Sequence, residues 1–355
     1  MRTLVVFFLF VAGFASAQSP VLYTRPSQMA KVLQRIGTTD IEVVYHSPLA
    51  KGRKIFGDIV PYNEKVNGVE WPWRAGANEN TTISFTHDVE INGNPLKAGT
   101  YGLHIFVSEK EWTLAFSNQY QAWGNFNYQA EEDALRVKVT PGTAEMQDWL
   151  SYDFSNPEPE SVTLSLRWEQ TKASFKISTN VDRNILADLN KIEAKKANHL
   201  YMMASLTLKL DSTDTNDAMM LVDESLALER SLGNSLLKAD LLRLTGKKTE
   251  AEQVKKAAIS ASTANELFTY AMKLDGESKS GVMELLKLNQ SRHPEDWFSY
   301  MGYANYYMTR EDYKNAVAYF EKTLEYAPAR GAGFARYRLG FAKNKLLEAS
   351  ARNKR

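Results

Sequence analysis

The sequence contains no cysteine in its 355 residues. Without thiols the chain has no disulfide bond, no thiolate nucleophile and no cysteine ligand for zinc or an iron–sulfur cluster. A chain of this length needs no disulfide, because domains of ordinary size each bury a sufficient core. The 43 basic and 42 acidic residues nearly cancel. Nucleic-acid binding, which usually needs a clearly basic domain, is therefore not predicted.

Motifs that identify common enzyme classes are also absent. The sequence lacks the GxSxG nucleophile elbow, the GxGxxG dinucleotide fingerprint, the GxxxxGK[ST] phosphate loop and the HExxH zinc motif. Histidine is scarce, and His46, His87 and His104 form a zinc site only if their strands are neighbours that face alike. Separate core or surface histidines are the alternative. No metal, no cofactor and no catalytic residue is predicted.

One strongly apolar segment lies at the N-terminus. Arg2 gives a positive start, Leu4–Phe14 is apolar, and Ala15-Ser16-Ala17 offers small residues for cleavage. This run is too short to span a bilayer, and no later segment reaches about 18 consecutive apolar residues. Residues 1–17 are predicted to be a signal peptide, so the mature chain is exported, to the periplasm or the extracellular space. A retained membrane anchor is the alternative.

Composition divides the remaining chain near residue 182. Six of the seven tryptophans precede that point, as do most turn signals, such as NGNPLKAGTYG and SNPEPE. Short alternating or β-rich runs between such turns predict an all-β sandwich or barrel over residues 18–182. The predicted strands cover residues 40–47, 81–89, 101–107, 111–117, 135–140, 149–154, 161–168 and 173–179. A short helix is predicted over Ser27–Ile36, after Pro26 and before Gly37.

Residues 183–355 have a helical period instead, with scarce proline and abundant Ala, Leu, Lys and Glu. The predicted helices cover residues 184–210, 216–230, 233–245, 247–261, 263–274, 278–292, 295–308, 311–326 and 331–349. Trp297–Arg330 resembles the 34-residue tetratricopeptide pattern, with small residues at Ala304 and Ala316 where two helices approach. The overall prediction is an α+β two-domain chain, in which an all-β domain precedes an all-α, tetratricopeptide-like solenoid.

Long motifs in the β half carry a second resemblance. They are SPLAKGRKIFGDIVPY at residues 47–62, WRAGANENTTISF at 73–85, LKAGTYGLHIF at 96–106 and EWTLAFS at 111–117. Their order resembles domain-of-unknown-function family 2911, which occurs mostly in exported bacterial proteins. The loop Asn63–Pro72 is longer than the corresponding family link. The resemblance implies a β fold and export, and it implies no activity.

The string WRAGANENTT is the densest polar cluster of the β half. With a nearby basic motif it supplies the candidate ligand-binding residues: Lys51, Arg53, Trp73, Arg74, Asn78, Glu79 and Thr81. One hypothesis is a pocket for an anionic or sugar-like ligand, with tryptophan as a stacking platform. The alternative is that these polar groups hydrogen-bond the loop backbone and hold the end of the β domain closed.

The preferred hypothesis is an exported, non-enzymatic binding or scaffold protein. The β domain would bind a small-molecule or glycan ligand, and the helical repeats would bind a protein or peptide partner. No membrane span is predicted in the mature chain. The alternative is a hydrolase acting on carbohydrate, with carboxylates or histidine of the β domain as its reactive groups.

Overall fold

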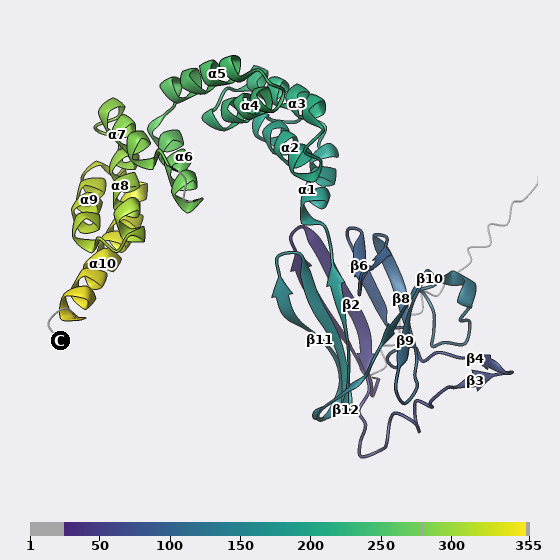
Figure 1. The fold of residues 1–355 in the computed structure, drawn as a ribbon. Coiled ribbons are helices and arrows are strands. Elements are labelled where there is room, and N and C mark those ends of the chain that lie inside the picture. Colours follow the sequence, from purple (N-terminus) through teal and green to yellow (C-terminus); the bar gives the residue numbers. More distant parts are fainter. Residues whose placement is uncertain (1–24, 278–279, 353–355) are drawn as a thin grey trace, which may run out of the picture. The chain divides into compact units, whose positions relative to one another are not determined.

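The computed structural model describes residues 25–277 and 280–352 (Figure 1). The predicted signal peptide, residues 1–17, lies outside the described residues. The chain divides into two compact units after Asn184. No helix of the described residues is long and apolar enough to cross a membrane.

The first unit contains a six-stranded antiparallel sheet. Its strands, in spatial order, are β1 (Gln28–Ile36), β2 (Thr39–Ser47), β5 (Thr82–Phe85), β8 (Gly99–Phe106), β9 (Trp112–Ser117) and β10 (Asp133–Val139). Alternate residues of β2 are buried, as expected for a strand with one face on a core. A short 3-10 helix, Ala130–Glu132, precedes β10.

A four-stranded sheet forms the second layer of this unit. Its order is β11 (Gly142–Glu158), β12 (Ser161–Ser178), β6 (Val89–Ile91) and β7 (Asn94–Leu96). The long hairpin β11–β12 is visible in teal in Figure 1. The predicted strands 161–168 and 173–179 are one strand, β12, in which Glu169 has a φ of 51° beside an irregular stretch of the pairing. The extended loop Asn63–Pro72 forms a small hairpin of β3 (Lys65–Val66) and β4 (Val69–Glu70).

Both sheets contribute side chains to one hydrophobic core. Phe56, Trp73, Trp112 and Trp168 form an aromatic cluster within it, and the Trp73 and Trp168 rings stack with centroids 5.9 Å apart. Two sheets that share one core form a β sandwich. The predicted fold class, a β domain followed by helical repeats, is confirmed.

The predicted helix over Ser27–Ile36 is wrong, because this segment is the edge strand β1. Every residue of β1 pairs antiparallel with β2, from Gln28 opposite Ser47 to Ile36 opposite Thr39. Alternate residues such as Val32 pack against the core. Gly37, at a φ of 55°, makes the tight turn into β2. Pairing with β2 therefore overrides the local helical pattern.

The second unit is helical. Its helices are α2 (Ala197–Leu210), α3 (Thr215–Leu228), α4 (Leu232–Leu244), α5 (Lys248–Ala261), α6 (Ala264–Gly276), α7 (Val282–Arg292), α8 (Trp297–Thr309), α9 (Tyr313–Tyr326) and α10 (Ala329–Arg352). Helix α1 (Val181–Asn190) links the two units. The single helix predicted over residues 184–210 is two helices, α1 and α2, separated by residues 191–196.

The helices repeat as pairs. Helices α2 and α3, α4 and α5, α6 and α7, and α8 and α9 pack against each other. The first helices begin at residues 197, 232, 264 and 297, and α10 begins at 329, so successive starts lie 32–35 residues apart. This interval and the pairing define a tetratricopeptide-like array.

The predicted repeat Trp297–Arg330 occupies α8 and α9. Ala304 and Ala316 are fully buried, as small residues at a close helix contact should be. Tyr303 stacks on Tyr319 with centroids 4.7 Å apart, and the Tyr300 hydroxyl donates to the Pro294 carbonyl. Tyr300 and Tyr303 therefore fill the core of this repeat.

Candidate functional site

Several of the candidate residues in WRAGANENTT hold the β unit together. The Trp73 ring lies against the aromatic core, and its Nε1–H donates to the Gly76 carbonyl at 3.0 Å. The buried Thr81 hydroxyl donates to the Ala75 carbonyl, and Asn78 Nδ2 donates to the Ser27 carbonyl. These contacts fit the structural interpretation of the cluster, and they leave Trp73 unsuited to serve as a stacking platform.

Lys51 and Arg53 lie on a different loop, which pairs with β11. Arg53 donates to the carbonyls of Leu49 and Ala50. The backbone N–H of Lys51 donates to the carboxylate of Asp148. The contacts of both residues are thus with this loop and β11, not with the WRAGANENTT cluster.

Arg74 is half-buried against the loop that contains Gly124. A Cβ atom added at Gly124 would lie 3.3 Å from a guanidinium nitrogen of Arg74. Glycine at this position therefore leaves space for the guanidinium group. Its Nε is buried and has no hydrogen-bond partner among the described residues. Burial lowers the pKa of Arg74. The group is a desolvated cation, and no carboxylate of residues 25–277 and 280–352 forms an ion pair with it.

Glu79 sits at the mouth of a shallow cleft. Its two carboxylate oxygens accept hydrogen bonds of 2.5 and 2.6 Å from Arg25, whose guanidinium lies 5.1 Å from the centroid of the Trp123 ring. The imidazole Nε2 of His46 lies 3.3 Å from the same carboxylate. Burial would raise the pKa of Glu79, but Arg25 and His46 lower it overall. Burial lowers the pKa of His46, so that imidazole is neutral at neutral pH.

A buried amide–imidazole pair lies behind this cleft. Asn80 Nδ2 lies 3.3 Å from His104 Nε2, while Asn80 Oδ1 and His104 Nδ1 have no partner among the described residues. Burial lowers the pKa of His104 to about 4. Both side chains are therefore uncharged polar groups inside the β unit.

The histidines do not converge on a metal site. His46 lies near one end of β2, whereas His87 Nδ1 lies 3.3 Å from Thr39 Oγ1 at the other end. In residues 25–277 and 280–352, no group of three or more histidines and carboxylates is placed to hold a metal ion.

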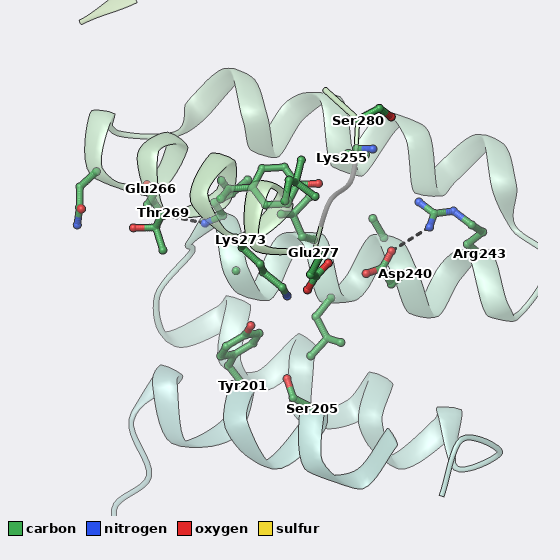
Figure 2. A pocket seen from close by; sticks show the side chains of 18 residues that line it. Tyr201, Ser205, Asp240, Arg243, Lys255, Glu266, Thr269, Lys273, Glu277 and Ser280 are labelled. Atoms are coloured by element: carbon green, nitrogen blue, oxygen red, sulfur yellow. Dashed lines mark hydrogen bonds and ion pairs between the residues drawn. The ribbon is translucent and has the colours of Figure 1, made fainter. Parts of the chain in front are cut away.

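A groove of about 670 Å³ runs along the first helices of three successive pairs of the described helical residues. Figure 2 shows Tyr201 and Ser205 of α2 directed toward it, with Lys273 of α6 close by. Its other lining residues include Leu232, Leu236, Leu237, Asp240 and Arg243 from α4, Lys255 from α5, and Asn265, Glu266, Thr269 and Leu274 from α6.

Some charged side chains of this groove have hydrogen-bond or ion-pair partners in the described part of the chain, and others do not. Asp240 pairs with Arg243 at 3.0 Å. Burial would raise the pKa of Glu266, but hydrogen bonds from the Leu232 N–H and from Thr263 lower it. Among the described residues no ion pair joins Lys255 or Lys273 to a carboxylate. The two ammonium groups line the groove beside leucine side chains and the carboxylate of Glu277.

Sequence reasoning missed both the groove residues and the cleft partners of Glu79. Most of the groove residues lie on the first helix of a pair, so the repeat interval was the sequence signal that could have pointed to them. The partners of Glu79 are far from it in sequence: they are Arg25, His46 and Trp123. Strand pairing and an isolated backbone β-bridge between Glu79 and Trp123 bring them together.

The fold defines the chain as a two-unit protein, a β sandwich followed by tetratricopeptide-like helical pairs. Residues 27–177 match the family described as "Protein of unknown function (DUF2911)", which confirms the resemblance of the β half. No curated protein matches the chain.

One similar solved structure is entitled "Crystal structure of APC/C hetero-tetramer Cut9-Hcn1". Its matching chain is 16% identical, with a TM-score of 0.27, over 47% of this chain and 33% of that one. The match thus spans about a third of that chain. The repeat assignment rests instead on the helix pairing and spacing described above.

Proposed function

We propose that this chain is an exported, non-enzymatic binding protein. Its helical unit holds an extended segment of a protein partner, and its β unit holds a small ligand. The groove along α2, α4 and α6 carries the proposal, because helical-repeat proteins bind partners on extended surfaces built from successive repeats. A concave, partly apolar groove with a few directed polar groups is also the general form of a binding site.

The groove chemistry selects the partner segment. Leu236, Leu237 and Leu274 offer apolar surface for apolar side chains of the segment. Lys255 and Lys273 offer two ammonium groups, which attract carboxylates more strongly than a neutral surface does. We therefore expect the bound segment to combine apolar and acidic residues.

The competing hypothesis of a glycoside hydrolase needs two carboxylates around the scissile bond, about 5–10 Å apart. Glu79 is the one carboxylate among the residues that line the described β cleft, and it is paired with Arg25. This favours binding over hydrolysis.

The proposal of export rests on the N-terminal sequence and on the family resemblance. N-terminal sequencing of the mature protein should give Gln18 as the first residue.

Selection from a random peptide library tests the proposal for the helical unit. The full mature chain should enrich peptides with apolar and acidic residues, and Lys273→Glu should weaken their binding at least about tenfold, or 1.4 kcal/mol. Lys256→Glu is the matched control, since Lys256 is exposed on α5 outside the groove. Equal losses in the two variants, or no enriched peptide, would overturn the proposal.

A further inference from the structure

The cleft beside Glu79 is a small, mixed polar and aromatic hollow of about 450 Å³. Its lining residues are Val44, His46, Glu79, Asn80, Thr82, Tyr120, Gln121, Ala122 and Trp123. They come from β2, from the start of β5 and the loop before it, and from the segment after β9. A hollow of this size accommodates a ligand of one or two rings, since typical small-molecule pockets measure roughly 300–1,000 Å³.

Two aromatic side chains of the cleft are exposed although the unit has a large aromatic core. Trp123 is 54% exposed, and Tyr120 lies beside it in the lining. The backbone around Trp123 is fixed, because Asn80 N–H donates to the Ala122 carbonyl and Gly124 N–H donates to the Asn78 carbonyl. The Trp123 indole is thus an apolar platform on a segment held by backbone hydrogen bonds. The indole N–H can add one polar contact.

The polar groups around this platform carry no net charge. The carboxylate of Glu79 is neutralised by Arg25 through two hydrogen bonds. His46, whose pKa burial lowers, is neutral at neutral pH. The other polar lining groups are amides and hydroxyls, which both donate and accept hydrogen bonds. Such a surface matches an uncharged ligand rich in hydroxyl groups better than an ion.

A buried amide supplies an independent indication of a ligand. Asn80 lines the cleft, is 95% buried (5% exposed), and uses one amide atom on His104. The other amide atom has no partner in the part of the chain that the structure describes. Rotating the amide by 180° exchanges its oxygen and nitrogen but still leaves one of them without a partner. Buried polar atoms are normally hydrogen-bonded, so an unpartnered one in a cleft wall needs an explanation.

We propose that this cleft binds an uncharged saccharide of one or two rings. One face of a sugar ring lies on Trp123, and its hydroxyl groups bond the free amide atom of Asn80 and the carboxylate of Glu79. This inference rests on the ligand-binding role proposed for the β unit and is independent of the helical groove. The alternative occupant is a cation, because Arg25 already places a guanidinium against Glu79 and Trp123.

Calorimetric titration of the full mature chain tests the inference. The probes are glucose, galactose, mannose, xylose, N-acetylglucosamine and the β-1,4-linked disaccharides of glucose and N-acetylglucosamine, with arginine amide as the cationic probe. We expect at least one saccharide to bind, and Trp123→Ala to weaken it at least about tenfold. Phe126→Ala is the matched control, since Phe126 is exposed on the same segment and is not a lining residue of the cleft.

A thermal melt of each variant shows that it is folded, and Asn80→Asp supplies a second variant that should also weaken the saccharide. Binding of arginine amide alone, binding of no probe, or equal losses in Trp123→Ala and Phe126→Ala would overturn the inference. Peptides selected on the helical groove should bind Trp123→Ala as they bind the parent. Failure at the cleft is therefore distinguishable from failure at the groove.

Discussion

The carboxylate of Glu266, at the start of α6, accepts a 2.7 Å hydrogen bond from the backbone N–H of Leu232, the first residue of α4. The two residues are 34 positions apart, which is one tetratricopeptide repeat. Thr309 and Asp275 are joined across the same separation. These two hydrogen bonds join α4 to α6 and α6 to α8, and α4 and α6 both line the groove.

Glu266→Gln should loosen the helical unit and change its response to pH. The folded-state pKa of Glu266 is lowered, so its stabilisation is complete above its unfolded pKa of about 4.3 and is lost as pH falls through the folded value. The difference in urea midpoint between parent and variant, followed by far-ultraviolet circular dichroism, should be larger at about pH 7 than at about pH 3. An identical difference at both values would contradict this assignment.

Ala316→Leu should destabilise the C-terminal repeats. Ala316 is fully buried in α9, and overpacking of a close helix contact costs about 1–3 kcal/mol. Ala318→Leu, at an exposed position two residues on, should stay within about 0.5 kcal/mol. Hydrogen exchange should show faster opening of α8 and α9 in the first variant alone. Equal effects would mean that the repeat register is wrong.

The β unit should need the first turn of α1. Asn184 is buried and donates to the hydroxyls of Thr39 and Thr179 at 3.0 and 2.7 Å. A fragment of residues 18–186 should therefore melt at a higher temperature than one of residues 18–182, although both should show a β-type circular dichroism spectrum. Asn184→Ala in the longer fragment should remove most of the difference. Equal melting temperatures of the two fragments would refute the role of Asn184.

His104 should remain neutral well below the usual pKa of histidine. Burial lowers its pKa from 6.5 to about 4, so the unfolded chain takes up the proton first and the β unit loses stability as pH falls between those values. Nuclear magnetic resonance titration of the imidazole checks the value directly. His104→Gln should flatten the stability slope in that range, and a His104 pKa near 6.5 would exclude the desolvated environment.

The sequence predicted the helical unit more fully than the β unit for a physical reason. In the helices, buried small residues such as Ala304 and Ala316 recur at the repeat interval. In β1, by contrast, Met29, Val32, Leu33 and Ile36 have helical spacing, and only pairing with β2 makes the segment a strand. Because β2 lies outside this segment, the pattern of the segment alone does not show the pairing.

The sequence identified some residues of the candidate site in the β unit and misplaced others. Glu79 was identified because it lies in a dense polar string, but its partners Arg25, His46 and Trp123 come from three other segments. Trp73 is an aromatic residue of the kind that can serve as a stacking platform, but its ring packs against the core. A local string therefore identifies polar residues, while the sheet register decides which of them share a cleft.

Hydrogen exchange with a selected peptide bound tests the central claim, that the first helices form the partner-binding face. We expect slower exchange over α2, α4 and α6 when the peptide is bound, with little change over α3 and α7 or in the β unit. Protection confined to α3, α5 and α7, or to the β unit, would contradict it.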